Sequence, residues 1–284
     1  MFKFLSNIWL LIKGDRTHNT HQLKFGCFKD TEDDRDYKKE FPTKVGSAHS
    51  TFSLRKYIAG GILNQKSTSA CTGYAGAYAL SILINRQIEL SAKDQNYKFS
   101  HVSPTYIYYN ARLSEGFSTK TDEGSTIRSI MKALKNPGAV DISVMGTDYS
   151  TTKEPPKNIN DLPKYTITSY FRIEKNENTI ELMQRVLDTE LLPIVCGVML
   201  YEEQTDNAYY NGGILDYSNI KNDTKVGGHA ICLTGYKYIN GKLYFELCNS
   251  WGTLWGNNGF GYIPADMVTS DDMLDIWTFD KRYF

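Results

Sequence analysis

The sequence predicts an α+β protein of two lobes with a cleft between them, and three observations lead to that prediction. Apolar residues recur at helical spacing in the first half of the chain, whereas short β-branched and aromatic runs follow Pro193. The chain has 284 residues, 41% hydrophobic and 23% charged, which is typical of a soluble globular protein. Helices and strands segregated along one chain favour the α+β class, with a functional site in the cleft.

Four helices are expected in the first part of the chain. Residues 72–87 are apolar almost all round, which indicates a buried helix. Gly73, Gly76 and Ala77 keep this helix slim, so other elements can approach it closely. The remaining helices are expected over residues 103–113, where Ser103-Pro104 gives an N-cap and a proline at the first helical position, from about 125 to Asn136-Pro137-Gly138, and after Asn178.

Five strands are expected in the second part. Each is a short run rich in β-branched or aromatic residues, and turn signals such as Asn240-Gly241 separate the runs. They cover residues 193–200, 229–236, 242–249, 260–264 and 275–279.

The charge balance limits the classes of partner, and the N-terminal sequence limits the compartment. Lys plus Arg number 32 and Asp plus Glu number 32, so the basic excess of a nucleic-acid-binding protein is missing, and no nucleic-acid partner is expected. No run of about 20 apolar residues predicts a membrane span. Residues 1–14 are apolar at their tip but lack a small-residue cleavage site, so a docked segment is favoured over a signal peptide. An intracellular or virion-associated location is therefore favoured over secretion.

A charged run at residues 29–40 is interpreted as a solvated loop. Its acidic residues do not form a calcium loop of the EF-hand kind, because the sixth position of the window from Asp30 is Arg35 instead of glycine.

Three residues carry a pattern typical of nucleophilic catalysis by a thiol. Cys71 stands at the start of the buried helix, His229 opens one strand, and Asn249 closes the next. A helix N-terminus and an imidazolium both stabilise a thiolate, and an asparagine can hold the histidine ring without adding charge. The five cysteines show no zinc-ligand spacing, and their number is too small for a disulfide scaffold.

The motifs around these residues resemble the papain-like cysteine peptidases. The resemblance covers roughly residues 25–284 and is carried by Gln65 with Ser69-Ala70-Cys71, by Gly228-His229-Ala230, and by the block Asn249-Ser250-Trp251-Gly252. Residues 26–37, Leu54-Arg55 and Thr72 after the cysteine look like a microbial and viral branch. The family usually has glycine-serine where Ser69-Ala70 stands. A disulfide common in the lysosomal and plant branch cannot form here, because Thr68 stands three residues before Cys71.

The resemblance implies a papain-like fold, with a helical left lobe and an antiparallel, β-barrel-like right lobe, and assigns the roles. Cys71 would be the nucleophile, His229 its base and then the acid for the leaving amine, and Asn249 the residue that orients His229. Gln65 and the backbone N–H of Cys71 would form the oxyanion hole. Trp251 would cover the His–Asn hydrogen bond and line the leaving-group side of the cleft. The other substrate-binding positions would be Gly124, Ser125 and Gly228.

The expected protein is a monomeric cysteine endopeptidase that acts on polypeptides and needs no metal or organic cofactor. Residues 1–24 would form an extension that acts as a cap, plug or targeting segment, followed by a catalytic domain at 25–284 with lobes at about 65–165 and 166–280. Cys232 and Cys248 should be buried and point away from the site. Two alternatives stay open: an inactive papain-like binding or structural module, and an acyltransferase that uses the same acyl-enzyme.

Overall fold

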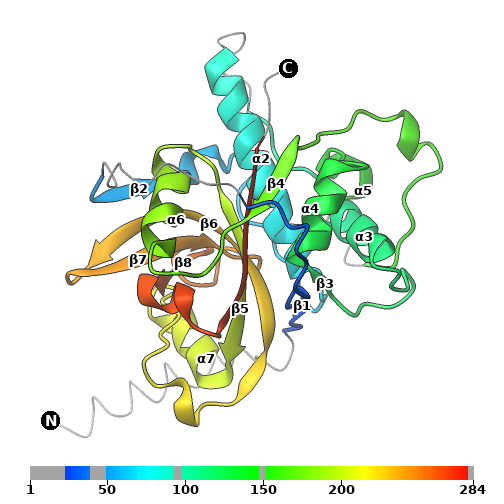
Figure 1. Cartoon of the computed structure of the whole chain (residues 1–284). Coiled ribbons are helices and arrows are strands. Elements are labelled where there is room, and N and C mark those ends of the chain that lie inside the picture. Colours follow the sequence, from blue (N-terminus) through cyan, green and yellow to red (C-terminus); the bar gives the residue numbers. More distant parts are fainter. Residues whose placement is uncertain (1–22, 39–48, 92–97, 147–150, 281–284) are drawn as a thin grey trace, which may run out of the picture.

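The computed structural model describes residues 23–38, 49–91, 98–146 and 151–280 and confirms the α+β class. Figure 1 shows helices α2 to α5 on one side and an antiparallel sheet with α6 and α7 on the other, with β1 (Cys27–Phe28) between the two parts. Most of the expected N-terminal extension, residues 1–22, lies outside the described residues. No helix of the described part is long and apolar enough to cross a membrane.

The helical lobe is built around α2 (Cys71–Ser91), whose first fifteen residues are all buried. Two glycines allow neighbouring elements to pack directly on its backbone, as the sequence predicts. A Cβ at Gly73 would lie 2.4 Å from the Pro104 oxygen, and one at Gly76 would lie 2.6 Å from Cγ2 of Ile130. The elements packed there are α3 (Pro104–Ser114) and α4 (Ile127–Lys135), followed by the short α5 (Ile142–Met145).

The second lobe is a seven-stranded sheet in the order β4-β9-β5-β6-β7-β8, with β2 paired to β6. All its named strand pairs are antiparallel. The strands are β2 (Thr51–Ser53), β4 (Ser169–Arg172), β5 (Ile194–Tyr201), β6 (Lys225–Ile239), β7 (Lys242–Cys248), β8 (Phe260–Pro264) and β9 (Met273–Asp280). The helices of this lobe are α6 (Thr179–Asp188) and α7 (Glu202–Tyr210).

Several elements escape the sequence analysis because they are short or polar. These are β1, β2, β4, β3 (Ser125–Thr126), α5, the glutamate- and tyrosine-rich α7, and the 3₁₀ turns Arg55–Tyr57, Ile159–Asp161, Ile220–Asn222 and Ala265–Thr269. Two-residue strands have no detectable apolar alternation. The parallel pair β1–β3 is the most consequential, because it joins an N-terminal segment to the helical lobe.

Candidate active site

Cys71 is the first residue of α2 and is fully buried. The loop before it is attached to the opposite lobe: the backbone N–H of Gln65 donates to the Ser250 oxygen over 2.8 Å, and Asn64 pairs with Trp251. Backbone N–H groups of Ala230 and Gly26 reach the Cys71 sulfur. Ala230 follows His229 on β6, so the thiol lies against the strand that carries the histidine.

His229 is held by Asn249 through one ring nitrogen. Nε2 of His229 lies 2.8 Å from Oδ1 of Asn249, and the backbone N–H of Ser250 also donates to that oxygen. Because the Asn249 Oδ1 can only accept hydrogen bonds, Nε2 of His229 must be the protonated nitrogen of the neutral imidazole. The other nitrogen, Nδ1, is buried and makes no hydrogen bond within the described residues, which leaves it as an acceptor.

Trp251 covers the histidine ring. The two rings stack with centroids 4.6 Å apart and planes 29° apart, and Trp251 is 7% exposed. The strand register explains why Asn249 and Trp251 lie close to His229. Cys232 pairs with Cys248, which sets Asn249 opposite Ile231, two residues from His229. Tight packing on its ring keeps His229 in one orientation.

Gln65 is buried next to this block, and its amide orientation is fixed from both ends. Ser250 donates its hydroxyl to Oε1 over 2.5 Å, so Nε2 is directed away from Ser250. That nitrogen donates to the Thr68 oxygen over 2.7 Å and to the Lys24 oxygen over 3.2 Å. Backbone carbonyl oxygens of this chain therefore accept the hydrogen bonds that the Gln65 amide would otherwise donate to an oxyanion.

Gly124 and Ser125 form an edge on the helical lobe, and a backbone strand lies along it. The N–H of Ser125 donates to the Gly26 oxygen over 2.9 Å, and β1 then runs parallel to β3. A Cβ at Gly124, whose φ is +109°, would lie 2.6 Å from that same oxygen. The edge expected to bind a substrate backbone thus binds residues 26–28 of this chain.

Residues 23–28, here called the plug, extend across the whole site. The ring of Phe25 packs edge-on against His229 and Trp251, with centroids 6.3 and 6.4 Å apart. On the β6 side, a Cβ at Gly228 would lie 2.1 Å from the Cys27 oxygen. Seven of the eight residues expected in the site therefore contact the plug, and the eighth, Asn249, is joined to it through His229. The plug straddles the expected boundary between residues 24 and 25.

Several known proteins are similar to this chain. Residues 63–273 match the papain family of cysteine proteases. The chain belongs to this family. It is 27% identical over 283 residues to an uncharacterised peptidase C1-like protein of Acanthamoeba polyphaga mimivirus, covering 91% of this chain and 87% of that protein. As a cysteine peptidase of this family, it acts on polypeptides.

Solved structures share the fold. Xylellain, a cysteine protease from Xylella fastidiosa, superposes with a TM-score of 0.78 at 24% identity, covering 92% of this chain and 98% of that one. Procathepsin B S9 of Trypanosoma congolense gives a TM-score of 0.68 at 14% identity, covering 100% and 99%.

Burial shifts the pKa values of both Cys71 and His229. It raises the pKa of Cys71 to about 11, although nearby backbone N–H groups act in the opposite direction. It also lowers the pKa of His229 to about 4, although the hydrogen bond that His229 donates to Asn249 acts in the opposite direction. The sequence argument predicted a stabilised thiolate, whereas burial in this closed site favours the neutral thiol and the neutral imidazole.

Other residues support the site and were missed from the sequence. Asp122 accepts from the Ser69 N–H over 2.9 Å and from the Tyr108 hydroxyl over 3.0 Å, and that hydroxyl accepts from the Gly124 N–H. Asp122 thereby connects the loop before Cys71 to the edge at Gly124 and Ser125. A single aspartate in a loop gives no sequence signal for this role. Cys232 and Cys248 are buried as expected, and all five cysteines are unpaired.

Proposed function

We propose that the chain hydrolyses peptide bonds through an acyl-enzyme on Cys71, with His229, Asn249 and Gln65 as its partners. The observation that carries this proposal is the His229–Asn249 hydrogen bond through Nε2, which leaves Nδ1 as a proton acceptor on the strand against the thiol. Trp251 stacked on the ring supports a histidine kept in one tautomer and orientation.

The reaction follows from these positions once a substrate replaces the plug. Nδ1 of His229 takes the thiol proton, and the Cys71 sulfur attacks the carbonyl carbon. The carbonyl oxygen, now negative, accepts hydrogen bonds from Nε2 of Gln65 and the backbone N–H of Cys71. His229 then gives its proton to the leaving amine as the C–N bond breaks, which leaves a thioester. Water, deprotonated by His229, attacks the thioester, and the carboxylic acid leaves as the thiol is restored.

Alkylation by an epoxysuccinyl peptide tests the proposal. We expect intact-mass analysis to show one added inhibitor, located at Cys71, together with loss of hydrolysis of a fluorogenic peptide. Cys71→Ala should abolish both signals, and Cys232→Ala, a change at another buried cysteine, should preserve both. Equal alkylation of wild type and Cys71→Ala would contradict the proposal. A folded protein that is alkylated but hydrolyses nothing would favour the inactive binding module.

A further inference from the structure

A cavity of about 530 Å³, here called the basic cavity, lies where the helical lobe meets the sheet. Its lining comes from three segments that are far apart in the sequence. These are the loop that follows β1, one face of α4, and Ser169 and Tyr170 of β4. The volume is within the range of roughly 300–1,000 Å³ that is typical of ligand sites. None of the lining residues belongs to the site around Cys71.

The loop after β1 gives the basic cavity a fixed wall. The sequence analysis interpreted residues 29–40 as a solvated loop, and residues 39 and 40 of that run lie outside the described residues. The interpretation is wrong for Asp30 and Asp36, whose side chains are 0% and 7% exposed. Asp30 accepts the ring N–H of the buried Trp277 over 2.8 Å. The loop is therefore anchored in the packed interior.

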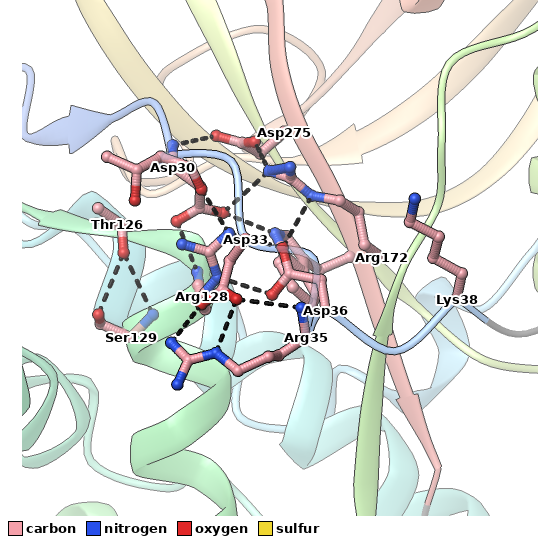
Figure 2. A network of polar contacts seen from close by, with 12 residues as sticks. Asp30, Asp33, Arg35, Asp36, Lys38, Thr126, Arg128, Ser129, Arg172 and Asp275 are labelled. Atoms are coloured by element: carbon pink, nitrogen blue, oxygen red, sulfur yellow. Dashed lines mark hydrogen bonds and ion pairs between the residues drawn. The ribbon is translucent and has the colours of Figure 1, made fainter.

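Two arginines that line the basic cavity are already neutralised. Nε and Nη2 of Arg35 donate to the two carboxylate oxygens of Asp33 over 2.8 and 2.7 Å. Nε and Nη2 of Arg128 donate in the same way to Asp36 over 2.8 and 2.6 Å (Figure 2). A carboxylate thus occupies each planar guanidinium fork, so neither arginine is available to bind a phosphate bidentately.

Two lysines add positive charge that no carboxylate in the described part of the chain compensates. Arg128, Lys132 and Lys135 stand at positions i, i+4 and i+7 of α4, so they share one face of the helix. Lys132 and Lys135 line the basic cavity and are exposed. Nζ of Lys135 lies 5.9 Å from the centroid of the Tyr170 ring, and Tyr37 lines the cavity from the loop. The basic cavity therefore joins aromatic rings to two available cations.

Helix α4 connects the basic cavity to the edge at Ser125. The helix begins at Ile127, directly after β3, and Lys135 is its last residue. At 1.5 Å per residue, Lys132 and Lys135 lie roughly 8 and 12 Å along the helix axis from its start. An extended chain covers at most about 3.6 Å per residue, so a polypeptide bound at the edge needs at least about three or four further residues to reach the cavity.

We propose that the basic cavity binds an acidic segment of the polypeptide substrate, whose carboxylates pair with Lys132 and Lys135. The available cations are two separate ammonium groups one helical turn apart, which suits two carboxylates on a peptide better than one compact phosphate. The remainder of the lining adds no net charge, because its two arginines are matched by Asp33 and Asp36.

The consequence for substrate choice rests on the proposed function. The leaving amine takes its proton from His229, so the acyl half of a substrate, which is N-terminal, lies on the other side, along the edge at Ser125. The preferred substrates therefore carry acidic residues four or more positions before the cleaved bond. Binding of an acidic peptide to the basic cavity needs no catalysis and can be measured by itself.

The first experiment measures binding without cleavage, in the full chain with Cys71→Ala. Fluorescence anisotropy compares a labelled peptide that contains four consecutive glutamates with a matched peptide that contains four glutamines. We expect the glutamate peptide to bind about fivefold more tightly, and the difference to disappear at about 0.5 M NaCl. Lys132→Gln/Lys135→Gln should abolish the preference, whereas Lys132→Arg/Lys135→Arg should keep it. Lys157→Gln/Lys221→Gln makes the same charge change at two exposed lysines outside the cavity and should also keep it.

Two results of the binding experiment would overturn the proposal. One is equal binding of the two peptides, or a glutamate preference that persists in Lys132→Gln/Lys135→Gln at an unchanged Tm. The other is displacement of the glutamate peptide by inorganic phosphate beyond the effect of sodium chloride at equal ionic strength, because that result would indicate a site for a small anion.

Hydrolysis by the wild type separates the acidic-peptide site from the proposed function. Two fluorogenic peptides share one cleavage sequence and carry the glutamates or the glutamines four or more positions before the cleaved bond. We expect kcat/KM to be about fivefold higher for the glutamate peptide, mainly through KM, and equal for both peptides in Lys132→Gln/Lys135→Gln. Selective binding without hydrolysis of either peptide would leave the acidic-peptide site standing and refute the peptidase mechanism. Hydrolysis of both peptides at equal kcat/KM, without selective binding, would do the reverse.

Discussion

Nε2 of His229 lies 2.8 Å from Oδ1 of Asn249, and the same oxygen accepts the backbone N–H of Ser250. Because that oxygen is fixed by a second donor, Asn249 holds the ring in one tautomer. We expect Asn249→Ala to lower kcat about 100-fold while Cys71 still reacts with alkylating agents. Steady-state kinetics with a fluorogenic peptide would measure this. A kcat unchanged by the substitution would show that the ring needs no such support.

Gln65 should contribute to the transition state more than to substrate binding. Gln65→Ala removes one oxyanion donor, so kcat should fall roughly 100- to 1000-fold with little change in KM. Ser250→Ala removes only the hydroxyl that orients the amide and should cost less. Because Gln65 also binds the Lys24 oxygen, the Gln65→Ala variant should open more readily to iodoacetamide. Loss of binding with kcat preserved would contradict the assigned role.

Gly26 should be indispensable for closure of the site. A Cβ there would lie 2.0 Å from the Ser69 oxygen, a backbone atom that cannot yield cheaply. Gly26→Val should therefore displace the plug and raise the alkylation rate of Cys71 roughly tenfold or more. Lys29→Ala, an exposed change three residues away, serves as the control and should react like wild type.

The ion pair between Asp36 and Arg128 should be strongly coupled. Removing either partner leaves the other charge buried, so Arg128→Met alone should lower the free energy of unfolding by about 3–5 kcal/mol. The double variant Asp36→Asn/Arg128→Met leaves no such orphan and should lose much less than the sum of the single variants. Urea unfolding of the wild type, the two single variants and the double variant measures the coupling free energy of the pair. Additive effects would mean that the pair is solvated.

The pH dependence of stability should contain two opposing contributions. Burial lowers the pKa of His229 to about 4 from its ordinary value of 6.5, so between these values the unfolded chain binds more protons and acidification destabilises the fold. Burial and the neighbouring Asp30 raise the pKa of Asp275, so this carboxyl takes up a proton first in the folded protein. In the same acid range Asp275 therefore favours folding.

Replacing Asp275 should expose the contribution of His229. The Asp275→Asn variant has no titrating group at this position, but its side-chain oxygen can still accept the Asp30 N–H. The variant should have a lower Tm overall because the pair with Arg172 is lost, and its Tm should fall more steeply than that of wild type from pH 6.5 to 4. Calorimetry across this range would measure the slopes, with Asp266→Asn, a change at an exposed side chain, as control. Equal slopes of Tm against pH in the wild type and the Asp275→Asn variant would show that Asp275 does not offset the contribution of His229.

The sequence predicted what depends on residue type and missed what depends on distant partners. Cys71, His229 and Asn249 could be found because the chemistry requires these types in a known order. Ser103 could be recognised as an N-cap, and its hydroxyl does accept the Tyr106 N–H. The burial of Asp30 could not be predicted, because its partner Asp275 is 245 residues away and an acidic run ordinarily faces water.

The same burial explains the error over the thiol. A helix N-terminus and a neighbouring histidine both predict a thiolate, and both features are present around Cys71. Neither outweighs the burial of the thiol, and the segment that passes it is paired to Ser125 by a strand of only two residues. The protonation of a neighbouring thiol and imidazole thus depends on what covers them, which local sequence does not specify.

Burial of Cys71 also bears on its chemical durability. Peroxides attack the thiolate, and susceptibility increases with exposure, so a buried, protonated sulfur is a poor target for oxidation. The strand that denies entry to a peptide denies it to an oxidant as well. Closed molecules should survive storage in air with the Cys71 thiol intact, and the thiol should become vulnerable to oxidation only while the site is open.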